Sequence, residues 1–231
     1  MAQSVRVPVL VELFTSEGCS DCPAADRLLE RLDKEQSVPG AEVIVLSEHV
    51  TYWNYLGWRD PFSFDTMDTR QQAYGARFGL SSIYTPQAVV DGAWQFVGSD
   101  ERRMTAAIAQ AAAITKTPLA LQEIHAGNGM VSFRVRGQID PHARLFAAVA
   151  ADATHSDVSR GENAGRTLHH VAVVRALKEF SGAVADGRSL HVDGVSLAGD
   201  LKAVGPLRLA VWAADARTGR VVAATMQTVP R

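Results

Sequence analysis

A pair of cysteines at the junction of two different apolar patterns is the feature that most constrains this chain. Cys19 and Cys22 are its only cysteines, and Pro23 follows them directly. Residues 7–14 form an apolar run that predicts a buried strand, and residues 24–32 have the spacing of an amphipathic helix. A strand that leads into a CxxC motif at the start of a helix is typical of a dithiol redox site.

The pattern continues as a strand–helix–strand unit. Residues 42–46 form a short apolar run, which is typical of a parallel strand that is buried on both faces. Parallel strands point the same way, so we expect residues 47–49 to lie at the same edge of the sheet as the cysteines. His49 is therefore a candidate neighbour of the dithiol.

An inserted segment of mixed character follows at about residues 50–80. It is dense in aromatic residues at first, and residues 69–79 then predict a helix that ends at a glycine. An Asp-Gly pair joins two short strands within residues 84–98, which is a strong hairpin signal. A helix over residues 101–113 completes this part of the chain.

Beyond residue 117 the pattern changes to short apolar strands separated by turns. Such a pattern is typical of an antiparallel sandwich, or of a sheet that packs on the first part of the chain. The predicted strands cover residues 131–135, 145–151, 190–195, 207–214 and 221–229. We therefore predict an α/β fold in which a domain over residues 1–117, with a helical insert, precedes a β-rich, sandwich-like domain over residues 118–231.

Composition excludes several classes of partner. The 231-residue chain has a net charge of −2, so there is no reason to expect binding to nucleic acid or to an anionic membrane. No apolar run approaches the roughly 18 residues of a membrane span. Residues 1–6 lack the apolar core of a signal peptide, so we expect either a cytoplasmic protein or a mature form with a start Met added.

The dithiol predicts thiol–disulfide exchange. At the N-terminus of a helix, the unpaired N–H groups favour the thiolate of Cys19, which we expect to be the more exposed cysteine and the nucleophile. Cys22 would then resolve the mixed disulfide. Asp21 adds a negative charge that opposes the helix end, so we expect a site that is less oxidising than one with a basic residue there.

Two other interpretations of the cysteines stay open. A lone CxxC is only half of a structural zinc site, but Cys19, Cys22 and His49 could form a soft site for copper(I). The cysteines could also be two buried thiols without chemistry. The redox interpretation needs no metal and no other cofactor.

Several motifs resemble known proteins. The strand over residues 9–14, the CxxC, Thr85-Pro86, and the hairpin with its closing helix resemble the thioredoxin superfamily element by element. More narrowly, four blocks are similar to the bacterial DUF1223 family: residues 11–26, 49–61, 84–92 and 161–170. The resemblance implies a thioredoxin-like fold for the first domain and a periplasmic or secreted location. Thr51 departs from the family, where we expect an Asp.

The superfamily resemblance also implies roles for single residues. Pro86 matches a cis-proline beside the CxxC, and Thr85 precedes it, so that backbone groups there could pair with an extended client. An ordinary trans proline at a strand start is the alternative. Glu12 matches a buried acid beneath the CxxC that could take the proton of Cys22; the alternatives are an edge-strand Glu that faces water and a Glu that is paired structurally with an Arg.

Other candidate residues each have more than one open interpretation. His49 could help to titrate Cys19, bind a metal, or serve only as a hydrogen-bonding group. Trp53, with its aromatic neighbours Tyr52, Tyr55 and Trp58, could form the wall of a client groove or merely pack the insert. We keep Thr85, Pro86, His49 and Trp53 as predicted client-binding residues.

The polar, glycine-bearing segment 161–170 is unusual for a sandwich loop. Glu162, Arg166 and His169 could fold over the CxxC from the second domain, or could form a structural ion-pair corner. The function we expect is that of a thiol–disulfide oxidoreductase for a protein or small-molecule client. The alternative is a non-enzymatic protein, which handles copper(I) or binds a partner through a thioredoxin fold.

Overall fold

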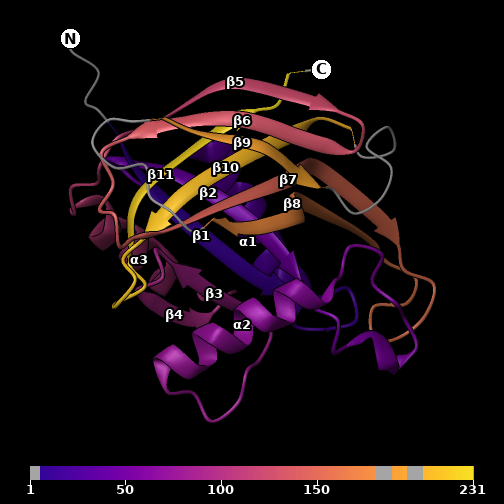
Figure 1. Cartoon of the computed structure of the whole chain (residues 1–231). Helices are drawn as coiled ribbons and strands as arrows, with labels where there is room; N and C mark the ends of the chain where they lie inside the picture. The colour runs from indigo at the N-terminus through magenta and orange to yellow at the C-terminus, as the bar shows by residue number, and fades with distance from the viewer. Residues whose placement is uncertain (1–5, 181–188, 197–204, 231) are drawn as a thin grey trace.

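The computed structural model of the chain describes residues 6–180, 189–196 and 205–230. It is a mixed α/β structure built on a large sheet (Figure 1). The sheet has eight strands in the order β11-β10-β7-β8-β2-β1-β3-β4, and a second sheet has three strands in the order β5-β6-β9. The start of the chain, on which the expectation about a signal peptide rests, lies outside the described residues up to position 5.

The first part of the chain follows the predicted order closely. Its elements are β1 (Val7–Thr15), α1 (Cys22–Glu35), β2 (Ala41–His49), the 3₁₀ turn η1 (Asn54–Leu56), α2 (Asp65–Phe78), β3 (Gln87–Val90), β4 (Trp94–Val97) and α3 (Glu101–Ala112). β1 and β2 are parallel, with Thr15 opposite His49, and β3 runs antiparallel to β1. The predicted strand–helix–strand unit and hairpin are confirmed, whereas α2 begins four residues earlier than predicted.

The second part of the chain is made of strands. They are β5 (Leu119–Gly127), β6 (Met130–Gly137), β7 (Arg144–Asp157), β8 (Thr167–Phe180), β9 (Ser189–Ser196), β10 (Leu207–Ala214) and β11 (Val221–Thr228). β5 and β8 carried no strand prediction, and β8 includes residues 167–170, which we had expected to lie in a loop. β8 joins the two parts, because Val173 pairs in parallel with Ser47 of β2. Strands from both sides of residue 117 therefore share one sheet; the division into domains at that residue stays a prediction.

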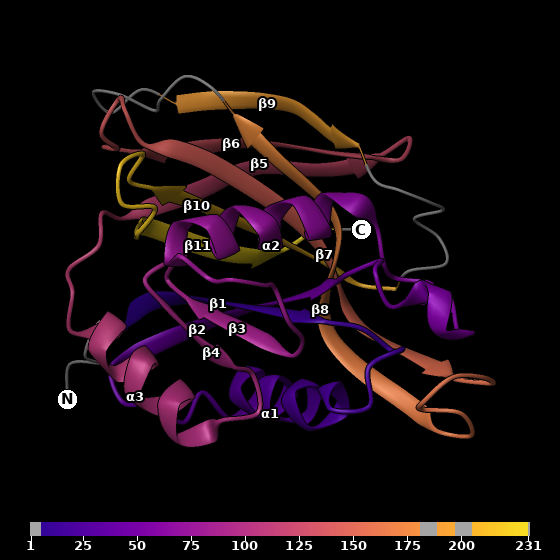
Figure 2. The same ribbon diagram turned by 90° about the horizontal axis from the view of Figure 1, so that it is seen from below.

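Two apolar cores lie between the sheets and the helices. One lies around β1 and β2, where α1 buries Leu28, Leu29 and Leu32. The other lies between the three-stranded sheet and alternate residues of β7 and β10, such as Val149 and Leu209. α1 and α3 cover one face of the large sheet and α2 covers the other (Figure 2).

The large sheet also curls toward α2. The N–H of Val221, at the start of β11, donates to the carbonyl of Asp91 in the β3–β4 turn at 2.9 Å. The Asp91 carboxylate in turn pairs with Lys116 at 2.6 Å. Strands near opposite ends of the sheet are thus brought together, and the helix α2 lies in the concave face.

Candidate active site

The CxxC motif lies at the carboxyl end of β1, where the chain turns into α1. Cys19 and Cys22 form a disulfide, with their Cα atoms 5.4 Å apart. The helix begins at Cys22, and Pro23 falls in its first turn, where a missing N–H has no helical partner to lose. Cys19 is 2 % exposed and Cys22 is fully buried, so Cys19 is the more exposed cysteine as predicted, although both side chains are buried. The two residues between them are exposed.

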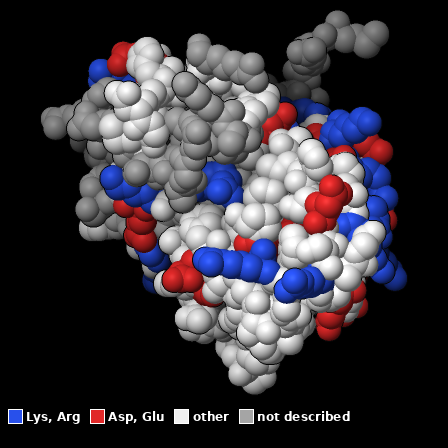
Figure 3. Space-filling model, turned by 90° about the vertical axis from the view of Figure 1, so that its right-hand side faces the viewer, with Lys and Arg blue, Asp and Glu red and all other residues white. Residues whose placement is uncertain are grey.

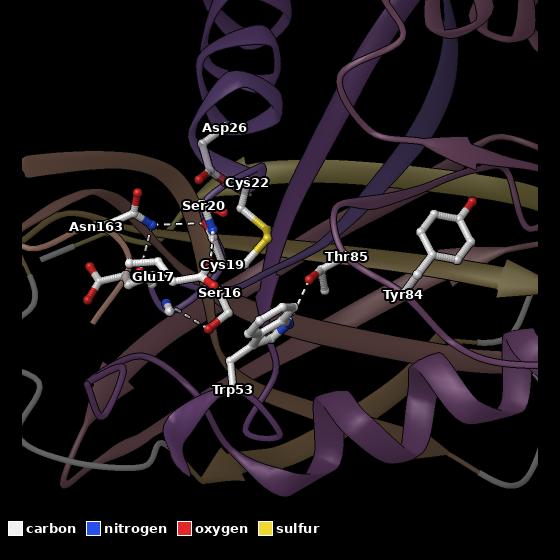
Figure 4. Close-up of a disulfide and its surroundings, with 12 residues drawn as sticks. Ser16, Glu17, Cys19, Ser20, Cys22, Asp26, Trp53, Tyr84, Thr85 and Asn163 are labelled. Carbon is white, nitrogen blue, oxygen red and sulfur yellow. Dashed lines mark hydrogen bonds between the residues drawn. A yellow bond between two sulfur atoms is a disulfide. The ribbon is translucent and has the colours of Figure 1, made fainter. Parts of the chain in front are cut away.

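The Thr85–Pro86 segment lies against the first turn of α1. Its peptide bond is cis, as predicted. A Cβ placed on Gly98 would lie 3.3 Å from Pro86 and 3.2 Å from Ala25, so both segments pack closely on this glycine. The indole N–H of Trp53 donates to the Thr85 hydroxyl at 2.7 Å. Trp53 and Thr85 lie beside the disulfide, and the ring of Tyr84 points away (Figure 4).

Trp53 also contacts the loop before the disulfide. A Cβ on Gly18 would come within 3.0 Å of the Trp53 Cβ. The predicted residues Cys19, Cys22, Thr85, Pro86 and Trp53 are therefore brought together at one end of α1.

Glu12 is placed on the other face of the sheet. Its carboxylate binds the guanidinium of Arg70 and accepts a hydrogen bond from Tyr74 at 2.5 Å, both on α2. Glu48 of β2 lies in the same cluster, and burial together with the charge of Glu12 raises its pKa well above the usual range. Thr15 is an odd number of residues along β1 from Glu12, so its side chain points to the α1 face instead. A catalytic role for Glu12 stays a prediction, and its contacts are those of a structural ion pair.

The buried acid on the α1 face is Asp26. It lies four residues after Cys22, one turn along the same side of α1 (Figure 4). One carboxylate oxygen is 3.7 Å from His170 Nδ1, and the other accepts no hydrogen bond within the described part of the chain. Burial raises the pKa of Asp26, and the charges of His170 and His49 offset this only partly.

Two buried histidines, His170 and His49, lie between Asp26 and two further acids, Glu17 and Asp60. The rings of His49 and His170 meet edge to face at 4.6 Å. His49 Nδ1 lies 2.7 Å from Asp60, and His170 Nε2 lies 3.2 Å from Glu17. Burial lowers the pKa of His49, but the charge of Asp60 and its hydrogen bond more than offset this, so that the pKa is raised. Burial raises the pKa of Asp60, yet His49 and two backbone N–H groups outweigh it and lower the pKa.

The loop between β7 and β8 covers the CxxC loop. The Asn163 side chain donates to the carbonyls of Glu17 and Cys19, both at 2.9 Å. The Glu162 carboxylate accepts from the backbone N–H of Ser20 at 3.0 Å. Of the residues predicted to fold over the dithiol, Glu162 reaches it directly. Arg166 acts through Asn163 at 3.1 Å, whereas His169 lies apart, exposed against His155.

Comparison with known proteins shows the family. The profile of the family described as "Protein of unknown function (DUF1223)" matches residues 10–211. This chain belongs to the DUF1223 family. The X-ray crystal structure of protein AGR_C_4864 from Agrobacterium tumefaciens is similar, with a TM-score of 0.70 and 26 % sequence identity over 97 % of this chain and 95 % of that one. No match was found among curated proteins.

The copper(I) alternative stays a prediction for this DUF1223 protein. In the disulfide the two sulfurs are bonded to each other, and His49 faces Asp60, His170 and Phe62. Across residues 6–180, 189–196 and 205–230, no group of three or more His, Cys, Asp or Glu side chains is arranged to hold a metal ion.

The insert of this DUF1223 protein has a structural role at several positions. Thr51, where we expected an Asp, binds the Asp68 carboxylate near the start of α2 through its backbone N–H at 2.7 Å and through its hydroxyl. The Trp58 indole donates to Glu17 at 2.8 Å. Of the aromatic residues Tyr52, Trp53, Tyr55 and Trp58, only Tyr55 is exposed, at 81 %. No described helix is long and apolar enough to cross a membrane.

Sequence reasoning missed four residues of the DUF1223 site. Asp26 could have been found, because it lies one turn after the CxxC on a predicted helix. Asn163 lies in the segment that we had singled out. His170 lies in that segment too, and Asp60 lies in the block 49–61, but neither was predicted as a site residue, because only the folded chain brings the insert and β8 under α1.

Proposed function

We propose that this DUF1223 protein is a thiol–disulfide oxidoreductase that acts through Cys19 and Cys22 on a protein or small-molecule client. The observation that carries the proposal is the placement of the disulfide at the start of α1, against the Thr85–Pro86 segment, with a buried acid one turn along the helix. The order β1-α1-β2-α2-β3-β4-α3 supports a thioredoxin-like core as the scaffold of this chemistry.

Reduction of a client needs the reduced dithiol. The Cys19 thiolate attacks one sulfur of the client disulfide, which breaks the client S–S bond, releases one client thiolate and leaves a mixed disulfide. Cys22 loses its proton and attacks Cys19, which re-forms the Cys19–Cys22 bond and releases the second client thiolate. The pair loses two electrons and the client gains them. An oxidising reaction runs through the same steps in reverse.

We assign the proton transfer at Cys22 to Asp26. A base must lie on the same face of the sheet as the thiol, and Asp26 does, whereas Glu12 is bound to Arg70 across the sheet. Burial, which raises the pKa of Asp26, makes its carboxylate a better proton acceptor near neutral pH than an exposed aspartate would be. We also propose an oxidising compartment, either the periplasm or the cell exterior, as the setting in which such a pair would cycle.

A direct test uses the purified chain. We expect dithiothreitol to reduce the disulfide reversibly with a definable potential, and the reduced protein to reduce insulin in a turbidity assay. Cys22→Ser should trap a mixed disulfide between Cys19 and the client, and Cys19→Ser should be inactive. A pair that dithiol reagents cannot cycle would overturn the proposal, and copper(I) titration of the reduced protein would then be the next measurement.

A further inference from the structure

The outer end of the β7–β8 hairpin extends past the rest of the large sheet (Figure 2). β10 pairs with β7 only as far as Ala151, so residues 153–157 pair with β8 alone among the strands that the structure describes. One face of this hairpin packs on α1 and the CxxC loop, where Leu168 and His170 are buried. Side chains alternate along a strand, so the neighbouring residue 169 lies on the opposite, exposed face.

Two histidines lie opposite each other on this exposed face. His155 of β7 is the cross-strand partner of His169 of β8, and both side chains are exposed. Their ring centroids are 5.9 Å apart, with an angle of 31° between the rings. Two imidazoles on one tetrahedral metal ion have their centroids about 5 Å apart, because each metal–nitrogen distance is about 2.0–2.1 Å. A small rotation of these two exposed side chains therefore brings them to the spacing of a metal-bound pair.

The nitrogen atoms of these two rings have no other role in the fold. Within the part of the chain that the structure describes, neither His155 nor His169 forms a hydrogen bond or an ion pair. The next residue along β8 differs, because His170 is buried and its two nitrogens face Glu17 and Asp26. A ligand between His155 and His169 would therefore break no existing polar contact.

The cross-strand pairs on either side of the two histidines favour a cation. Asp157 is opposite Thr167 on one side, and Ala153 is opposite Val171 on the other, so neither flanking pair carries a positive side chain. The Thr167 hydroxyl donates to the Asp157 carboxylate at 2.6 Å, which holds this negative charge in place. Diagonal neighbours on paired strands lie about 7–8 Å apart, so the charge of Asp157 acts on an ion between the histidines.

From this arrangement, we propose that His155 and His169 together bind one divalent transition metal ion, copper(II) most tightly, with water in the remaining coordination positions. Imidazole suits copper(II), nickel(II) and zinc, and the affinity of a given site is highest for copper(II) in this series. Two linked ligands bind about 10²–10⁴-fold more tightly than one alone. Neither cysteine takes part, so the proposal does not depend on the redox chemistry of the CxxC motif.

Copper(II) chloride is the probe for the test, added to the oxidised full chain so that no free thiol competes. Calorimetric titration at pH 7 should show saturable binding of one ion, and magnesium, which prefers oxygen ligands, should show none. His155→Thr and His169→Thr keep the β propensity of the strands and should each weaken copper(II) binding at least tenfold. His125→Thr, which changes a single exposed histidine on β5, is the matched control and should leave the affinity unchanged.

A second measurement makes the location testable. Copper(II) is paramagnetic, so in NMR spectra of the native chain it should first broaden the backbone amide signals of residues 153–157 and 167–171. Both site variants change exposed side chains and should keep the native circular dichroism spectrum. The absence of saturable copper(II) binding, or equal binding of magnesium, would overturn the proposal. Unchanged affinity in either site variant, an equal loss in His125→Thr, or broadening centred elsewhere would overturn it as well.

Discussion

At the scale of single residues, Glu12 and Asp26 are two buried acids that differ in what surrounds them. Glu12 has a guanidinium and a phenol as partners, so its charge is compensated in place. Asp26 has one oxygen without a hydrogen-bond partner in the described chain, and its nearest cationic group is a histidine. Ionisation of a buried carboxylate costs free energy when its charge is not fully compensated. Such a carboxylate therefore holds its proton to a higher pH than one that is paired with a guanidinium.

This difference predicts how stability depends on pH. The pKa of Asp26 is higher in the folded chain than the 3.8 of a free aspartate, so the folded state binds more protons between these two values. The contribution of protonated Asp26 to the free energy of unfolding is therefore fully present below pH 3.8. It is lost as the pH rises through the pKa of Asp26 in the folded chain. Asp26→Asn should unfold at a higher temperature than the native chain at pH 7. That advantage should vanish near pH 3.8, as scanning calorimetry would show.

The same residue predicts a kinetic effect. Removal of a general base typically slows a step by about 10²–10⁴-fold, so Asp26→Asn should slow the attack of Cys22 on a mixed disulfide at pH 7 by at least tenfold. The reaction of the reduced protein with 5,5′-dithiobis(2-nitrobenzoate) releases one thiolate for each cysteine step, and stopped-flow absorbance separates the two. Glu12→Gln is the matched control on the opposite face. A slow second step in Glu12→Gln and a normal one in Asp26→Asn would reverse our assignment.

At the scale of elements, the β7–β8 loop covers the CxxC loop. Asn163 holds two carbonyls of the CxxC loop, and both cysteines are buried beneath exposed residues 20 and 21. A client can reach the Cys19 sulfur only if this contact opens or if the reduced form relaxes. The same loop packs on the insert, because a Cβ on Gly161 would come within 3.3 Å of Trp58.

Truncation of Asn163 should therefore make Cys19 more reactive. Asn163→Ala leaves two buried carbonyls without donors, at a cost of about 1–3 kcal/mol for each, and so favours the open loop. We expect the reduced protein to react with iodoacetamide roughly tenfold faster, since about 1.4 kcal/mol corresponds to a factor of ten. Ser159→Ala, an exposed change in the same loop, should leave the rate unaltered. Unchanged alkylation in Asn163→Ala would show that the loop does not limit access.

At the scale of the whole molecule, one buried ion pair holds the curled sheet. Lys116 follows α3, and its ammonium contacts the Asp91 carboxylate at 2.6 Å and the Pro8 carbonyl at 2.5 Å. The other Asp91 oxygen accepts the N–H of Leu10 at 2.9 Å. These contacts join β1, the β3–β4 turn and the chain that leads to β5, beside the point where β11 meets that turn.

Loss of one partner of this pair should destabilise the whole chain. Lys116→Met leaves the Asp91 carboxylate buried and uncompensated, and such changes cost about 3–5 kcal/mol. Urea unfolding should show a lower midpoint with an unchanged slope. The double variant Lys116→Met/Asp91→Asn should recover part of the loss, because it removes the buried charge. A single variant as stable as the native chain would show that the pair does not hold the sheet.

Charge on the outer surface is mixed. On the face shown in Figure 3, acidic and basic side chains are interspersed. This agrees with the small net charge of −2, and no broad field of one sign is visible on that face.

The sequence by itself determined the local elements and the dithiol. Short apolar runs, a CxxC before an amphipathic stretch, and an Asp-Gly pair are local signals, so β1, α1, β2 and the β3–β4 hairpin could be predicted from them. β8 could not, because its alternation of buried and exposed residues begins inside a polar segment that resembles a loop.

Only the tertiary structure decided which side chains meet. Glu12 and Asp26 are both acids near the CxxC in sequence, and the pleat of β1 and the turn of α1 place them on opposite faces. His170 and Asn163 lie more than 140 residues from the CxxC and reach it because β8 pairs with β2. Contacts over such separations depend on how strands pair and how the sheet curls, and no local pattern in the chain encodes that.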